Sequence, residues 1–141
     1  MLSNFIRMKA MPGGQDCGLL ALRLIVPSVL FLRHGTEKLF TFSSMAGHFP
    51  DPLHIGRVPS LVIAMIADGI CMPLLVIGLA TRWAALWSFC NLLVAWIFVH
   101  HLQFFGRGGD HGELIVVYMG VMITLFLAGA GKYSVDAHIG S

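Results

Sequence analysis

The residues of this chain that could do chemistry are charged side chains inside apolar stretches. Asp68 lies well inside the stretch from residue 59 to 79, and His34 and Lys38 lie near the end of the stretch before it. An ionised side chain at the centre of a bilayer costs on the order of 3 kcal/mol, so such residues usually face the interior of a helical bundle and mark function. We therefore predict that Asp68 belongs to a buried polar network, with a partner such as Lys38 or Arg33.

Further polar residues flank the same stretches. If consecutive stretches run in opposite directions, these residues converge on one half of the protein, which predicts a polar pocket there. We predict Asp68 and Glu113 as catalytic residues that exchange protons. The predicted substrate-binding residues are Arg33, His34, Glu37, Lys38, Asn91 and His100. The alternative is that the charges near the stretch ends lie in interfacial water, with Lys38 and Arg33 extended toward the surface and Glu113 only capping a helix.

The elements that must position these residues are four apolar stretches, at residues 18–42, 59–79, 82–100 and 113–130. The chain has 141 residues, of which 57% are hydrophobic and only 11% are charged. A soluble domain usually has about a quarter charged residues, and a helix of roughly 20 apolar residues crosses a bilayer. The composition predicts an all-α protein, an antiparallel bundle of four transmembrane helices. Residues 1–17 are expected to form an interfacial segment, and residues 18–137 the membrane domain.

The positive residues predict the orientation of this bundle. An even number of spans puts both termini on one side of the membrane, and Arg7, Lys9, Arg82 and Lys132 fall on that side. Only Arg57 and Arg107 fall on the other. Because cytoplasmic loops carry the excess of Lys and Arg, we predict that both termini are cytoplasmic and that the protein spans the cell (inner) membrane several times.

The sequence contains only weak signals for a metal site or a redox site. The adjacent His100 and His101 point about 100° apart on a helix, so they cannot both bind one ion without distortion. We predict no metal site, although haem or copper binding through histidine remains an alternative. Cys71 and Cys90 are expected at similar depth, where they would either pack or form a redox pair. No nucleic-acid partner is predicted; the expected partners are the lipid bilayer and other membrane subunits or further copies of this chain.

Three segments of the chain resemble one known family. The first is Arg23 followed by His34-Gly35-Thr-Glu-Lys38-Leu-Phe, and the second is Asp68-Gly69 followed by Gly78-Leu-Ala-Thr-Arg82. The third is Gly129-Ala-Gly-Lys-Tyr-Ser-Val-Asp136. In this order, over residues 20–137, they resemble the DoxX family of small four-helix membrane proteins. Asp68 stands where that family commonly has glutamate, and Lys132 where it frequently has arginine; both changes preserve the charge.

The resemblance implies a role in respiratory or sulfur redox systems. We expect an accessory membrane subunit whose pocket binds a quinone headgroup or a small sulfur species, so that a quinone is the expected cofactor. Asp68 or Glu113 would exchange protons, Lys38 would hold an anionic or carbonyl oxygen, and the apolar part of the bundle would receive an isoprenoid tail. The alternative from another class is a structural or chaperone subunit of a larger membrane complex, without chemistry of its own.

Overall fold

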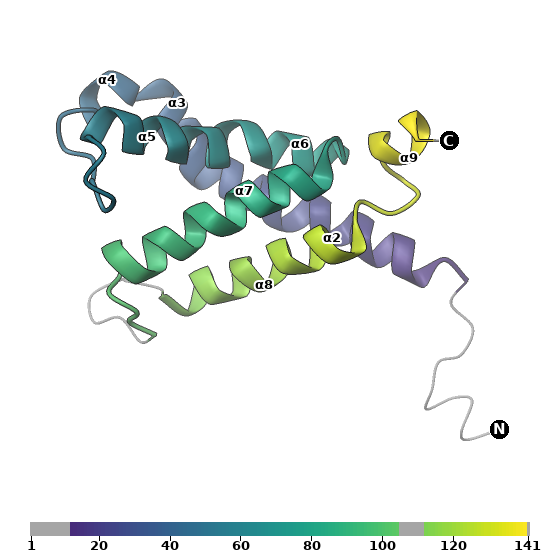
Figure 1. The fold of residues 1–141 in the computed structure, drawn as a ribbon. Coiled ribbons are helices and arrows are strands. Elements are labelled where there is room, and N and C mark those ends of the chain that lie inside the picture. The colour runs from purple at the N-terminus through teal and green to yellow at the C-terminus, as the bar shows by residue number, and fades with distance from the viewer. Residues whose placement is uncertain (1–11, 105–111, 141) are drawn as a thin grey trace.

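The computed structural model describes residues 12–104 and 112–140, and within these ranges every regular element is a helix. Four long helical segments lie side by side and a short helix follows them (Figure 1). The first segment consists of α2 (Gly14–Leu30), the π-helical turn η1 (Phe31–Gly35) and α3 (Thr36–Phe40), and the one-turn α4 (Phe42–Met45) follows it. The second consists of α5 (Arg57–Met65), the π-helical turn η2 (Ile66–Cys71) and α6 (Met72–Ile77). The third consists of α7 (Thr81–Val94) and the π-helical turn η3 (Ala95–Val99), the fourth is α8 (Gly112–Ala128), and the short helix is α9 (Val135–Ile139).

Three of these segments are long and apolar enough to cross a membrane. They span 27, 21 and 19 residues, at Gly14–Phe40, Arg57–Ile77 and Thr81–Val99, whereas α8 is apolar but has 17 residues. Large apolar side chains on the surface of all four segments are widely exposed, including Phe40 of α3 at 85% and Leu127 of α8 at 67%. Such surface is stable against acyl chains rather than water, and the protein is an integral membrane protein that lies in lipid.

The first helix starts earlier than the sequence predicts, at Gly14 rather than at residue 18. Residues 1–11 of the predicted interfacial segment, including Arg7 and Lys9, lie outside the described residues, as does Arg107. The start of α2 contacts the segment after α8, because the Lys132 N–H donates to Asp16 Oδ1 at 2.9 Å. The two ends of the helical domain therefore lie at the same end of the molecule.

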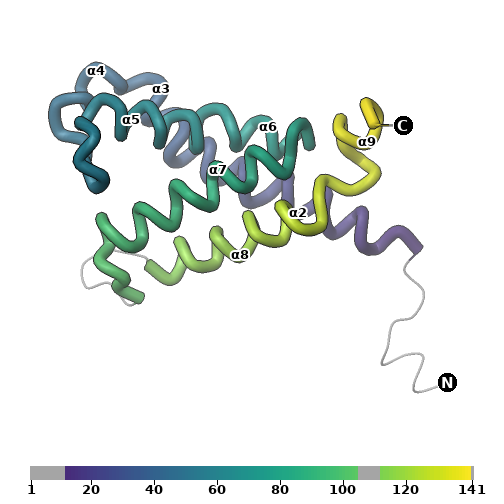
Figure 2. The backbone as a smooth tube through the Cα atoms, viewed as in Figure 1, coloured from purple at the N-terminus to yellow at the C-terminus, as the bar shows by residue number. Residues whose placement is uncertain are grey.

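The tight apolar core occupies one half of the molecule. In this half α2 packs against α6, and α7 packs against α8, as the tube in Figure 2 shows. The side chains of Leu75, Ala85, Met122 and Leu125 have no exposed surface. We call this half, which contains the turn between α6 and α7 at residues 78–80, the turn end. The other half, with the connection at residues 41–56, we call the loop end.

A buried arginine joins three segments of the chain at the turn end. Arg23 is fully buried, and its guanidinium donates to the carbonyl oxygens of Val76 at 3.1 Å and of Tyr133 at 2.7 Å, and more weakly to that of Leu75 at 3.4 Å. The last carbonyls of an α-helix lack partners within the helix and carry the negative end of its dipole. Arg23 of α2 therefore satisfies the end of α6 and ties it to the segment after α8.

Asp136 holds the same segment to the start of α7. Its carboxylate accepts the N–H groups of Ala80 at 2.7 Å and Thr81 at 2.9 Å, and its own N–H donates to the Gly78 carbonyl at 2.8 Å. Gly78 has φ 72°, a left-handed conformation that ends α6 and that glycine adopts without strain. An acidic side chain at the start of a helix satisfies free N–H groups, so Asp136 caps α7 from a distant part of the chain.

Candidate functional site

The most buried acid among the described residues forms an ion pair with a lysine from another helix. Lys38 Nζ of α3 lies 2.8 Å from Asp68 Oδ2 of η2, and each side chain is only 11% exposed. The sequence predicts Lys38 or Arg33 as the partner of Asp68, and in the structure the partner is Lys38. The attraction between two ions is strong at low dielectric and offsets the cost of removing them from water only when the geometry is good, as it is here.

Two π-helical turns meet at this ion pair. η1 carries His34 and Gly35 just before Lys38, and η2 carries Asp68. A Cβ on Gly35 would overlap with the backbone carbonyl oxygen of Asp68, so the two backbones touch there. Pro73 follows η2; its ring and its missing N–H disturb the helical hydrogen bonds of the preceding turn. The close approach at Gly35 and the irregular turn together bring Asp68 within reach of Lys38, and π-helical turns are frequent at functional sites.

The ion pair forms part of the wall of a cavity of about 860 Å³ at the loop end. This volume lies within the range of small-molecule sites, roughly 300 to 1,000 Å³. All four long helical segments contribute to the lining, and most of it is apolar. The lining residues with charged, hydroxyl, amide or imidazole groups are Arg33, His34, Lys38, Ser60, Asp68, Asn91, His100 and Tyr118. A cavity with an apolar lining and a few convergent polar groups is typical of a ligand-binding site.

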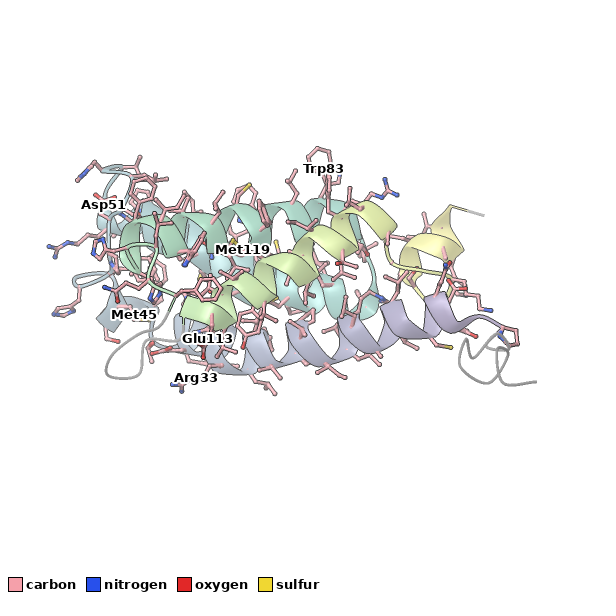
Figure 3. The ribbon with its side chains drawn as sticks, turned by 90° about the horizontal axis from the view of Figure 1, so that it is seen from below. Arg33, Met45, Asp51, Trp83, Glu113 and Met119 are labelled. Carbon is pink, nitrogen blue, oxygen red and sulfur yellow. The ribbon has the colours of Figure 1, made fainter. Side chains whose placement is uncertain are left out.

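The structure brings six of the eight predicted site residues to this cavity and leaves two outside. Asp68, Lys38, His34, Arg33, Asn91 and His100 line it. Glu37 and Glu113 are exposed and are not among the lining residues. Figure 3 shows Arg33 at the edge of the molecule, with its side chain directed away from the helices. The charge inside the cavity is therefore concentrated on the Lys38–Asp68 pair.

One face of α7 lines the cavity, and of its residues only Asn91 was predicted from the sequence. Trp83, Leu86, Trp87, Cys90, Asn91 and Val94 all line the cavity. Their spacing of three and four residues places them on one side of the helix. The sequence contains this pattern, because these residues lie at helical spacing from Asn91. The Trp87 Nε1–H also donates to the Ile63 carbonyl of α5 at 3.4 Å, which joins the two cavity walls. Cys90 is an exposed free thiol, whereas the free thiol of Cys71 is buried in the apolar core.

Residues 46–56, the part of the connection after α4, cover the loop end of the cavity, to which they contribute Phe49, Pro50, Pro52, Leu53 and Ile55. Asp51 organises it, because its carboxylate accepts the N–H groups of Ile55 and Gly56 and the hydroxyl of Ser60, at 3.0, 2.9 and 2.9 Å. Desolvation opposes ionisation of this carboxyl, but the hydrogen bonds from Ser60, Gly56 and Ile55 outweigh it and lower the pKa of Asp51. The loop is therefore fixed to the start of α5 by a carboxylate that stays ionised.

The sequence comparisons agree with this architecture. The sequence model of the DoxX family, described as DoxX, matches residues 18–101, which include Arg23, Lys38, Asp68 and Arg82 but not the segment from Gly129 to Asp136. Two Haemophilus influenzae proteins, each described as an uncharacterized protein, are similar to the chain. One is 31% identical over 126 residues, covering 83% of this chain and 87% of the relative; the other is 29% identical over 132 residues, covering 89% and 85%. No solved structure matches the chain. Because the family match covers more than half of the chain and includes Lys38 and Asp68, this protein belongs to the DoxX family.

Proposed function

We propose that the chain crosses the cell (inner) membrane four times, as an antiparallel bundle with both termini in the cytoplasm. Three segments have the length and composition of membrane spans, and α8, which packs along α7, supplies the fourth. Arg82 and Lys132 lie at the turn end, which the positive-inside rule assigns to the cytoplasm. The domain division into residues 1–17 and 18–137 follows from the same proposal. The loop end and its cavity then lie in the outer half of the bilayer.

We propose that this cavity binds the headgroup of a quinone and that the protein serves as a membrane subunit of a respiratory or sulfur redox system. The observation that carries the proposal is the buried Lys38–Asp68 pair in the wall of a largely apolar cavity. A quinone has a flat apolar ring with carbonyl oxygens, and it needs both a hydrogen-bond donor and a proton source when it is reduced. A small sulfur anion, the other ligand predicted from the sequence, would use the same cations.

The ion pair supplies a physical mechanism for both needs. When a ring carbonyl accepts a hydrogen bond from the Lys38 ammonium, Asp68 loses part of the positive charge that stabilises its carboxylate. The Asp68 carboxylate, no longer held by Lys38 alone, is then positioned to relay protons between the loop end of the cavity and the ring. As a redox partner supplies two electrons to the ring, Asp68 passes one proton to the ring oxygen held by Lys38, and water at the loop end supplies the second proton to the other ring oxygen. Asp68, again a carboxylate, then returns to its pair with Lys38. Because Glu113 does not line the cavity, Asp68 is the acid that transfers a proton to the ring.

Quinone binding by the purified protein tests the proposal. Trp87 lines the cavity, so a bound quinone should quench its fluorescence. We expect Lys38→Met and Asp68→Asn to weaken binding at least about tenfold, the usual result of removing a hydrogen bond to a charged group. Glu37→Gln and Glu113→Gln are the matched controls, because both acids are exposed outside the lining. Equal affinity in all four variants would reject the quinone site.

A structural subunit without chemistry is the second candidate, and the turn end favours it. Arg23, Gly78 and Asp136, which all belong to the segments that resemble the family, bind the chain's own backbone there. These residues therefore stabilise the fold rather than a ligand. Copurification from native membranes distinguishes the two candidates. A complex that assembles and works normally with Asp68→Asn supports the structural role, whereas an assembled complex without quinone-dependent turnover supports the redox role.

A further inference from the structure

The cavity does not end at the ion pair but continues along α7 toward the turn end. The lining residues of α7 run from Val94 and Asn91 through Cys90 to Trp83. Asn91 and Trp83 are about 12 Å apart along a helix that rises 1.5 Å per residue. We call this part, lined by Trp83, Leu86, Trp87 and Cys90, the α7 groove.

The α7 groove opens sideways to the surroundings of the protein. The side chains of Trp83 and Trp87 are 77% and 44% exposed. Figure 3 shows Trp83 projecting from the side of the molecule, farther from the loop end than Asp51. Ile63 and Ala64 of α5 form the opposite wall. In an integral membrane protein this opening faces acyl chains.

The route through the middle of the protein toward the turn end is closed. Below the ion pair, the core of Met72, Leu75, Met122 and Leu125 is fully or almost fully buried and packed. Protein cores pack like organic crystals and leave no channel wide enough for an alkyl chain. Because the described residues of this core are closely packed, the α7 groove offers more room for the expected isoprenoid tail than the middle of the bundle does.

We propose that the ligand of this cavity is amphipathic, with a polar ring at Lys38 and Asp68 and an unbranched or isoprenoid chain in the α7 groove, and that it enters sideways from the lipid between α5 and α7. The inference rests on the proposed quinone site and names the class of its ligand. The charged part of the cavity, at Lys38 and Asp68, matches the polar ring of such a molecule, and the apolar α7 groove matches its chain. A small sulfur anion would interact with the charged part and leave the apolar groove to lipid.

A photoreactive ligand tests where the chain lies. The probe is a benzoquinone with a decyl chain that carries a diazirine at its far end; a chain of roughly ten carbons matches the length of about 12 Å between Asn91 and Trp83. Irradiation of the full-length protein in lipid nanodiscs, followed by peptide mass spectrometry, locates the cross-links. We expect them at residues 83–87, and we expect excess benzoquinone bearing an unlabelled decyl chain to remove at least nine-tenths of them.

Two substitutions test whether the chain lies in the α7 groove. Ala64→Trp fills the groove from the α5 wall and should abolish cross-linking at residues 83–87, while Val29→Trp, at a position on α2 that is 50% exposed and outside the cavity, should not. Cross-links that competitor removes but that lie on α2 or α6 would overturn the α7 groove and leave the quinone site standing. If competitor removes none of the cross-links and Lys38→Met changes none, the quinone site itself fails and the inference falls with it.

Discussion

Lys38 Nζ and Asp68 Oδ2 lie 2.8 Å apart between two helices that touch at Gly35, so the site and the packing of these helices depend on each other. A lysine and an aspartate buried at this depth must remain together, because either one alone would leave an unpaired charge in a medium of low dielectric. The pair is therefore a constraint on the fold as well as a candidate binding element.

The first prediction concerns the stability of this pair. Asp68→Asn and Lys38→Met should each destabilise the protein by about 3 kcal/mol, because each leaves a buried charge without its partner. The double variant should be more stable than either single variant, since both charges are then gone. Thermal unfolding in detergent, followed by tryptophan fluorescence, measures all three. Glu37→Gln should leave the melting temperature unchanged, and a double variant whose loss equals the sum of the two single losses would show that the ions do not interact.

The second prediction concerns the contact between η1 and η2. Gly35→Ala should destabilise the protein by roughly 1 to 3 kcal/mol, because the added methyl group overlaps with the Asp68 carbonyl and forces the backbones apart. The control is Gly18→Ala in α2, where a Cβ meets no atom within 4 Å. There, alanine should stabilise the helix by up to about 1 kcal/mol, the usual difference in helix propensity. The contact is refuted if the two variants melt at the same temperature.

The third prediction concerns Arg23. Arg23→Lys should loosen the turn end although it keeps the charge, because one ammonium group cannot replace a planar guanidinium that reaches Val76 and Tyr133 together. Limited proteolysis should then cut residues 131–140 at least several times faster than in the parent protein. The exposed Arg33 provides the control, and Arg33→Lys should leave the rate unchanged. Equal rates in all three proteins would argue against a bridging role for Arg23.

The fourth prediction is a pH dependence that arises from Asp136. Desolvation opposes its ionisation, but the hydrogen bonds from Thr81 and Ala80, with the charge of Arg23, outweigh this and hold the pKa of Asp136 below its ordinary value. A depressed pKa contributes stability that is fully present above the pKa of the unfolded chain, about 4, and that is lost as the pH falls through the folded pKa. The melting temperature should therefore drop on acidification below about pH 4.

The comparison with Asp136→Asn isolates this effect. At neutral pH the variant should be less stable by about 1 kcal/mol, the typical value of a helix cap. The difference from the parent protein should shrink as the pH falls, because the parent then loses the same charge. A difference that stays constant down to about pH 3 would assign the acid sensitivity to another group.

The sequence alone determined that the protein is helical and lies in a membrane. Helix formation satisfies the backbone within each segment, so length and apolar composition are sufficient to locate the long helices to within a few residues. The sequence also identified Asp68 and Lys38, because a charge inside an apolar segment has a cost that demands a partner.

Only the tertiary structure decided which residues share the cavity. Glu37 is the neighbour of Lys38 in the sequence and Glu113 the neighbour of the lining residue Leu114, but the rotation of each helix turns both acids away from the cavity. The α7 groove, the cover formed by the loop at Asp51 and the bridge made by Arg23 depend on contacts between segments far apart in the chain. The period of a helix shows which residues share a face, but the partner of that face is set by how all the helices pack together.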